Sequence, residues 1–389
     1  MDFALTEAQA EIRRQVAGLA RGFGWEYWRA KDRKAEYPEE FVRAFADAGW
    51  LGLTIPEAYG GAGLGVTEAV LMLEAICASG AALSGASPIH FAVFPAMPII
   101  KHGTEALRRR ILPEIAAGRL SLAFGVTEPD AGTDTSRIRT TARPDGAGWV
   151  VSGRKVWTSN ARHSRKMLLL ARTTPYEAAG PRKLDGLTLF VADLDPATVE
   201  IREIDKLGRA AVDSNELVID GLRVARDDVV GEVGRGFHHL LDSLNPERVL
   251  VAAEAIGIGR VALERAAAYA RERVVFGRPI GQNQAVAHPL AGAWARLEAA
   301  WALTLRAAWR YDRGEPCGAE ANAAKLLAAD AGFEATDAAL QTFGGFGYAK
   351  EYDIERLWRE VRLYKIAPVS QQMALNYLAE RVLGLPKSY

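Results

Sequence analysis

The feature that most constrains the fold is a change of pattern in the middle of the chain. Residues 121–232 contain short, apolar, β-type runs separated by Gly, Pro and Asp turns, without helical stretches between them. These runs cover 122–126, 149–157, 167–171, 187–192 and 216–219. Strands at this spacing predict an antiparallel barrel or sandwich. They argue against a parallel dinucleotide-binding sheet, in which strands alternate with helices.

Helical patterns flank the β-type segment on both sides. Thr6 and Gln9 form a capping box, which starts a helix that runs to about Ala20. Four more helices are predicted before residue 120, at 39–48, 67–77, 91–102 and 104–117. Alanine-rich helices at 236–273, 283–313, 318–342 and 354–382 predict a four-helix bundle. We therefore expect an α+β multidomain chain, with an all-α domain (1–120), a β-barrel or sandwich (121–232) and a helical bundle (233–389).

Composition excludes several classes of function. Lys+Arg and Asp+Glu are both 48, so bulk charge attracts neither nucleic acid nor an anionic membrane. Cys77 and Cys317 are too few for a disulfide framework and have no metal-ligand neighbours, so no metal is expected. The start of the chain carries Asp2, Glu7 and Glu11 instead of the apolar run of a signal peptide. No stretch approaches about 18 uninterrupted apolar residues, the length of a membrane span. We expect a cytoplasmic protein.

One loop carries the residues of a candidate ligand site. After the run 122–126, residues 127–134 read Thr-Glu-Pro-Asp-Ala-Gly-Thr-Asp. Thr127 and Thr133 offer side-chain oxygens, and Gly132 lets the backbone come close to a ligand. Such a loop can hydrogen-bond a flat polar ring system. The alternative is a plain connection between two strands.

The loop resembles the flavin-contacting signature of the acyl-CoA dehydrogenases, Thr-Glu-Pro followed by Ala-Gly-Ser/Thr-Asp. Other segments resemble family motifs in the same order along most of the chain. They read Trp-Thr-Ser-Asn at 157–160, Arg-Val-Val-Phe-Gly at 273–277, and Gln-Thr-Phe-Gly-Gly-Phe-Gly at 341–347. The resemblance implies FAD as the cofactor, instead of a nicotinamide, and the same α–β–α order of domains.

The resemblance also implies which residues contact the cofactor. Trp157 would pack on the flavin, and the hydroxyl of Ser159 would face its N5 edge. Arg273 would contact the pyrophosphate, which suits a planar cationic donor. In the family the Arg273 segment reaches the flavin of a neighbouring subunit, so a homotetramer or dimer is implied. The expected FAD contacts are Phe124, Val126, Thr127, Gly132, Thr133, Trp157, Ser159, Arg273, Phe276, Gln284, Gln341, Gly344, Gly345, Ser370 and Gln372.

The catalytic base departs from the common pattern of the family. Dehydrogenating an acyl thioester needs a base for the α-proton while the β-hydride passes to the flavin, and a buried carboxylate with a raised pKa suits that task. Most members place this glutamate in a Tyr-Glu-Gly-Thr segment, where the present chain has Ala-Pro-Val-Ser at 367–370. Pro368 cannot be a base, and it has no N–H for the thioester oxygen. A neighbouring N–H, a local backbone shift or a different chemistry would have to account for this loss.

Isovaleryl-type and long-chain members carry the glutamate directly before an arginine on another helix. Glu247, followed by Arg248, matches that position and is the candidate base. The alternative is that Pro246 starts or kinks a helix and Glu247 lies in its solvated first turn. The expected substrate contacts are Thr133, Leu244, Asn245 and Arg248. His90 and His102 have no matched partner in the sequence, and we interpret them as packing or surface residues.

Three functions are compatible with these patterns. The first is an FAD-dependent acyl-CoA dehydrogenase that makes a trans-2-enoyl-CoA and passes electrons to an electron-transferring flavoprotein. The second is a flavin-dependent oxidase or monooxygenase of the same fold. The third, suggested by Pro368, is a non-catalytic CoA-binding homologue.

Overall fold

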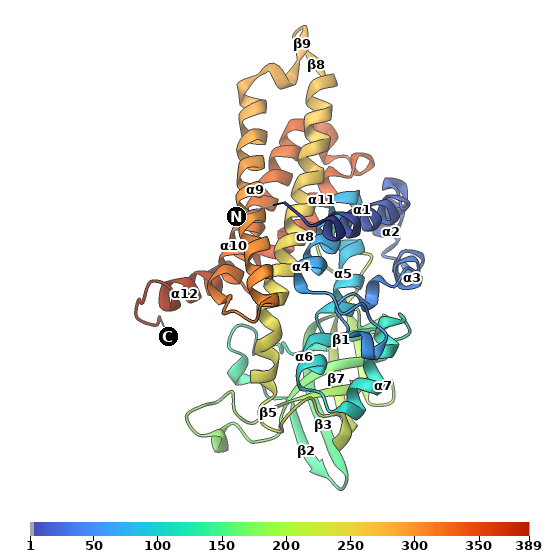
Figure 1. The fold of residues 1–389 in the computed structure, drawn as a ribbon, viewed down its shortest axis with the longest axis vertical. Helices are drawn as coiled ribbons and strands as arrows, with labels where there is room; N and C mark the ends of the chain where they lie inside the picture. The colour runs from blue at the N-terminus through green and yellow to red at the C-terminus, as the bar shows by residue number, and fades with distance from the viewer. Residues whose placement is uncertain (1–3, 389) are drawn as a thin grey trace.

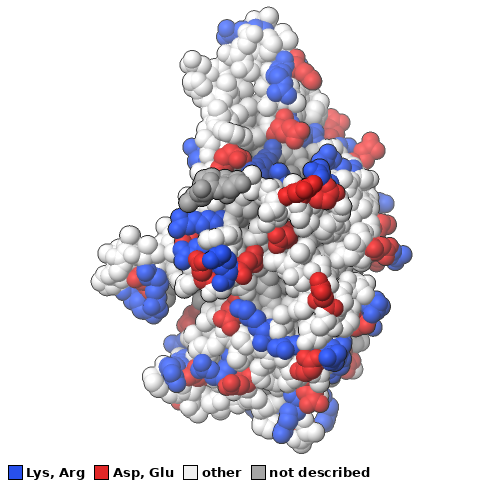
Figure 2. All heavy atoms as spheres, in the orientation of Figure 1, with Lys and Arg blue, Asp and Glu red and all other residues white. Residues whose placement is uncertain are grey.

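A computed structural model describes residues 4–388 of the chain. Asp2 and the other outermost residues of the predicted first and last domains lie outside this range. Figure 1 shows a β-domain at one end of the molecule, long helices that run to the other end, and the N-terminal helices packed along their side. Lys, Arg, Asp and Glu side chains are interspersed over the face drawn in Figure 2, in line with the zero net charge.

Seven helices form the N-terminal part: α1 (Glu7–Arg21), α2 (Trp25–Lys34), α3 (Glu39–Asp47), α4 (Val66–Ile76), α5 (Ala82–Val93), α6 (Ala96–His102) and α7 (Glu105–Ala116). The capping box of α1 is confirmed, because the hydroxyl of Thr6 accepts from the Gln9 N–H and the Gln9 amide oxygen accepts from the Thr6 N–H. The single predicted helix at 91–102 is wrong. Pro95 has no N–H to continue a helical ladder, and α5 and α6 meet there.

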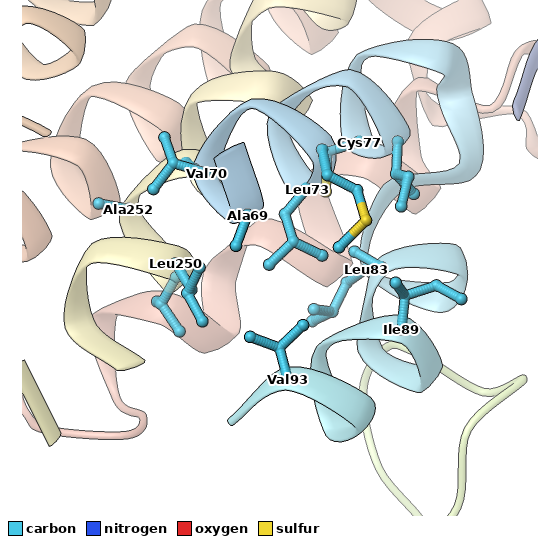
Figure 3. Packing of buried hydrophobic residues seen from close by; sticks show 14 of the residues in the cluster. Ala69, Val70, Leu73, Cys77, Leu83, Ile89, Val93, Leu250 and Ala252 are labelled. Atoms are coloured by element: carbon cyan, nitrogen blue, oxygen red, sulfur yellow. The ribbon is translucent and has the colours of Figure 1, made fainter. Parts of the chain in front are cut away.

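The stretch Val66–His102 is long and apolar enough to cross a membrane by length and composition, with a mean hydropathy of 1.6. However, 89% of that apolar window is buried within the protein. Val70 and Leu73 of α4 and Ile89 and Val93 of α5 pack in one cluster with Leu250 of the C-terminal part (Figure 3). This burial is typical of core helices, so the stretch is weak evidence for a membrane span.

The β-domain contains β1 (Leu122–Gly125), β2 (Thr141–Asp145), β3 (Gly148–Ser159), β4 (Lys166–Arg172), β5 (Leu187–Asp193), β6 (Val199–Glu203) and β7 (Ser214–Ala225). The sheet has the order β1-β4-β2-β3-β7-β6, and β5 pairs with β4. Most pairs are antiparallel, whereas β1 and β2 pair with β4 in parallel. The sequence did not predict β2 and β6, whose residues are mostly polar.

Strand β4 joins the β-domain to the helices. Met167 and Leu169 point into an apolar core within the β-domain, and Leu168 and Leu170 point into the large core shared with the helices. Alternate residues of a strand face opposite sides, so both faces of β4 are buried. This explains why its sequence is a continuous apolar run rather than an alternating one.

The C-terminal part consists of α8 (Gly236–Glu272), α9 (Gln284–Asp312), α10 (Gly318–Phe343), α11 (Ile354–Val361) and α12 (Gln371–Arg381), with a small hairpin, β8 (Val274–Val275) and β9 (Arg278–Pro279), between α8 and α9. The single predicted helix at 354–382 is wrong. A break at 362–370 separates α11 from α12, because Pro368 has no N–H and the Ser370 hydroxyl caps the new helix by accepting from the Met373 N–H at 3.3 Å.

Candidate active site

A buried ion pair anchors the loop that follows β1. The Nζ of Lys155 lies 2.9 Å from Glu128 Oε1 and donates to the carbonyl of Val126 at 3.0 Å. The Glu128 carboxylate also accepts from the N–H groups of Arg139 (2.7 Å) and Thr140 (2.9 Å). Burial lowers the pKa of Lys155 to about 8, although Glu128 pulls it the other way. The buried Lys155–Glu128 pair therefore holds both ends of the loop, at Val126 and at Arg139–Thr140.

The outer part of this loop faces outward. Gly132 and Thr133 are exposed, and Thr127 and Val126 are half-buried beside them. Phe124, on β1, is also half-buried, and its ring contacts that of Phe94 at 4.8 Å between centroids. The predicted ligand residues of the segment thus lie together on one end of β1.

A β-bulge presents Trp157 next to this loop. The register of β3 against β7 shifts between Lys155 and Thr158, and Trp157 takes a positive φ of 59°. A bulge of this kind re-aims a side chain out of the regular ladder. The side chain of Trp157 is accordingly 57% exposed although it belongs to a central strand. An exposed indole offers a flat apolar face to a planar ligand.

Arg209 holds the hydroxyl of Ser159. Its Nη2 donates to Ser159 Oγ at 2.7 Å and to Ser214 Oγ at 2.8 Å, and its Nη1 donates to Ser87 Oγ at 3.4 Å. Arg209 is buried and has a positive φ of 58°. Sequence reasoning missed this residue, because no motif marks the loop between β6 and β7.

Glu247 lies within α8 and is buried, with an exposed fraction of 9%. The helix begins at Gly236 and continues through Pro246, so the alternative of a solvated helix start is wrong. Burial raises the pKa of Glu247 to about 7, while the positive charges of His90 and Arg248 oppose this shift. A carboxylate in such surroundings is a stronger base than an ordinary surface glutamate.

Three predicted substrate residues surround Glu247 on the same helix. Arg248 Nη1 donates to Asn245 Oδ1 at 3.1 Å, and Leu244 packs against the large core. Thr133, the fourth predicted substrate residue, is on the exposed loop after β1. The two segments come from different domains.

His90 and His102 both have carboxylate partners, so the prediction that they lack them is wrong. His90 Nδ1 lies 2.9 Å from Glu254 Oε1, and His102 Nε2 lies 2.8 Å from Asp242 Oδ2. The hydroxyl of Tyr364 donates to Glu254 Oε2 at 2.8 Å. These pairs join residues that are more than a hundred positions apart, and no spacing in the sequence could have marked them.

A second group of predicted cofactor residues lies at the far end of the long helices. Its members are exposed and comprise Arg273, Phe276, Gln284, Gln341, Gly344 and Gly345. Arg273 follows Glu247 by 26 residues of helix, which is about 39 Å at 1.5 Å per residue. Figure 1 shows β8 and β9 at the opposite end of the molecule from the β-domain. Within one chain, these residues and Trp157 therefore form two separate groups.

Ser370 and Gln372 lie at the start of α12. The Ser370 hydroxyl is already engaged as the helix cap, and Gln372 is exposed. Lys325 Nζ donates to the carbonyl of Val369 at 2.5 Å and to Gln371 Oε1 at 2.9 Å, which fixes this segment to α10.

Comparisons with known proteins identify the family of the chain. Models of the N-terminal, middle and C-terminal domains of acyl-CoA dehydrogenases match residues 6–119, 123–222 and 234–383. The chain is 39% identical over 392 residues to acyl-CoA dehydrogenase fadE12 of Mycobacterium bovis, across 100% of this chain and 99% of the relative. The chain belongs to the acyl-CoA dehydrogenase family.

Solved structures share the whole fold. The glutaryl-coenzyme A dehydrogenase complex with glutaryl-CoA is 30% identical, with a TM-score of 0.93, and the match covers 100% of this chain and 98% of that one. Butyryl-CoA dehydrogenase from Megasphaera elsdenii is 29% identical, with a TM-score of 0.91 and coverages of 96% and 98%. Membership of the acyl-CoA dehydrogenase family makes the protein a flavin-dependent oxidoreductase with FAD as its cofactor.

The residues present fit FAD. Trp157 offers an exposed aromatic face, and the loop after β1 offers backbone and hydroxyl groups beside it. Ser159, whose hydroxyl accepts from Arg209, lies on the same strand as Trp157. Among residues 4–388, no cluster of three or more His, Cys, Asp and Glu side chains could hold a metal ion.

We predict that Glu128→Gln weakens FAD binding and destabilises the β-domain. The change leaves Lys155 buried without its anion, and removing one partner of a buried ion pair costs about 3–5 kcal/mol. FAD affinity is measured by flavin fluorescence, and stability by thermal unfolding. Arg154 is next to Lys155 on β3 and pairs with Glu216 of β7 at the surface, so Arg154→Met is the matched control. Equal behaviour of the two variants would contradict an anchoring role for Glu128.

Proposed function

We propose that the protein catalyses the α,β-dehydrogenation of an acyl-CoA thioester to a trans-2-enoyl-CoA, with Glu247 as the base that removes the α-proton. The observation that carries this proposal is the buried Glu247 carboxylate on α8, whose pKa is raised to about 7. At the position that most members of the family use for this glutamate, the present chain has Pro368. Glu247 would serve as the base instead, at the position where isovaleryl-type and long-chain members carry this glutamate.

The residues around Glu247 support this chemistry. Bound FAD supplies the acceptor for the β-hydride. The surrounding core excludes water, so Glu247 meets the α-proton as a poorly solvated carboxylate of near-neutral pKa, which suits proton abstraction at physiological pH. Arg248 lies one residue on and would hold the CoA side of the thioester. Pro368 has no N–H, so another donor has to hold the thioester oxygen.

We propose an acyl-CoA as the substrate and an electron-transferring flavoprotein as the electron acceptor. Support for the substrate class comes from the relatives, whose names specify glutaryl-CoA and butyryl-CoA. The flavin ring would lie between Trp157, Ser159 and the loop carrying Thr127, Gly132 and Thr133. The remaining proposed contacts are Phe124, Val126, Ser370 and Gln372.

We also propose that the protein is a homotetramer, or at least a dimer, in which each FAD contacts two chains. The exposed group around Arg273 adjoins β8 and β9, at the opposite end of the molecule from the β-domain that carries Trp157 (Figure 1). Phe276 is fully exposed at the tip, and Trp294 and Trp309 of α9 are 60% and 53% exposed. Figure 2 shows few charges over the upper part of α9. Large exposed aromatic side chains are typical of protein–protein interfaces.

Glu247→Gln should retain FAD and acyl-CoA binding but lose most flavin reduction, by roughly 10²–10⁴-fold, because general-base catalysis typically contributes that factor. The measurement is anaerobic bleaching of the flavin by a panel of acyl-CoAs. Glu264→Gln, an exposed glutamate on the same helix, is the control and should reduce at the parental rate. Parental reduction by Glu247→Gln would mean that the base lies elsewhere. If the reduced parent protein is rapidly reoxidised when air is admitted, the result would favour an oxidase. If the parent protein binds acyl-CoA tightly and its flavin does not bleach, the result would favour a non-catalytic homologue.

The rate of flavin reduction should rise with pH and level off above about 7, the pKa of Glu247. The base works only when it is ionised, and burial raises its pKa, so activity is lost as the pH falls through that value. Stopped-flow measurement of flavin reduction between pH 5.5 and 9, with a saturating acyl-CoA, gives the midpoint of this rise in rate with pH. A limb near pH 4.5 would indicate a carboxyl group that is solvated in the working enzyme.

Subunit complementation tests the shared cofactor site. Trp157→Ala and Arg273→Glu should each bind FAD poorly, because each removes one half of the proposed contacts. After subunit exchange, a mixed dimer contains one site built from two intact halves, so FAD binding and activity should reappear. Without recovery in the mixture, both groups would have to serve FAD in some other way than across a subunit boundary.

A further inference from the structure

Three buried polar side chains from distant segments meet beside α8. His90 comes from α5, Glu254 from α8, and Tyr364 from the short turn after α11. One oxygen of the Glu254 carboxylate lies 2.9 Å from His90 Nδ1, and the other accepts from the Tyr364 hydroxyl at 2.8 Å. Exposed fractions are 7% for His90, 2% for Glu254 and 3% for Tyr364. Both oxygens of Glu254 are thus held in a dry environment.

This cluster lies on the same side of α8 as Glu247. Glu254 follows Glu247 by seven residues, two helical turns, which places the two carboxylates on one face about 10 Å apart along the axis. Leu250 lies between them and packs in the cluster with Val93 of α5 (Figure 3). The imidazole of His90 therefore projects from α5 toward the α8 face that carries both glutamates.

The hydrogen bonds favour the imidazolium form of His90. Burial alone lowers the pKa of His90, but the charge of Glu254 and its hydrogen bond outweigh burial, so the pKa is raised overall. Glu247 adds to this effect and Arg209 opposes it. From the other packed elements, Glu360 of α11 is engaged by Ser84, and Cys77 before α5 is a buried thiol. His90 and Arg209 both contribute positive charge near Glu254, and His90 and Arg248 do so near Glu247.

We propose that His90, clamped by Glu254 and Tyr364, is a positioning residue that holds a positive charge beside Glu247 and keeps this base ionised in its dry surroundings. Two buried carboxylates on one helix face repel each other, so Glu254 without a cation would favour the protonated, inactive form of Glu247. The imidazolium of His90 offsets the negative charge of Glu254, and its positive charge also favours the ionised form of Glu247. The role assigned to His90 rests on the proposed function, because it requires Glu247 to be the base. The electrostatic coupling between His90 and Glu247 does not depend on that function.

Infrared difference spectroscopy measures this coupling without turnover. The band of the protonated Glu247 carboxyl group is assigned by its absence in Glu247→Gln, and its loss with rising pH gives the titration midpoint. His90→Gln removes the cation and should move this midpoint upward by on the order of one pH unit. His90→Lys restores a cation next to Glu254 and should return the midpoint most of the way. His102→Gln, which also removes a histidine paired with a carboxylate, should leave it unchanged.

The pH limb of flavin reduction should follow the same order among these variants. A midpoint for Glu247 in His90→Gln within about 0.2 pH units of the parent would overturn the proposal, as would identical midpoints for His90→Gln and His90→Lys. If the infrared midpoints shift as expected but Glu247→Gln still reduces flavin at the parental rate, the coupling stands and the choice of base is wrong. The two failures are therefore distinguishable.

Discussion

The desolvation of one carboxylate is the constraint on which the site depends. Glu247 is buried within a long helix, and this burial, opposed by the charges of His90 and Arg248, raises its pKa to about 7. At the surface the same side chain would be a weak base. In the proposed site the burial of Glu247 on α8 would supply the base that the reaction needs, and any change that admits water to this part of the core should weaken that base.

In the proposed site the β-domain would meet a different requirement, which is to present polar groups to the cofactor from a loop that is held in place. The Lys155–Glu128 pair and two backbone N–H groups hold the loop from inside. The bulge in β3 then turns the Trp157 side chain outward beside that loop. A loop that is anchored on its buried side and exposed on its outer side can bind a large cofactor at low entropic cost, because little of the protein has to be ordered on binding.

Sequence reasoning succeeded where the pattern is local. The capping box at Thr6 and the apolar run of β4 follow from neighbouring residues. It failed where structure depends on distant partners. His90 finds Glu254 across 164 positions, and Arg209 reaches Ser159 across 50. The break before α12 was missed because the helical pattern continues on both sides of Pro368, and β2 and β6 because their residues are mostly polar.

The most direct measurement is a crystal structure of the protein with FAD and an unreactive acyl-CoA analogue. We predict that a carboxylate oxygen of Glu247 lies within roughly 3–3.5 Å of the α-carbon of the acyl group, the separation needed for proton transfer. An acyl chain bound with its α-carbon far from Glu247, or with another side chain in that place, would contradict the assignment of Glu247 as the base.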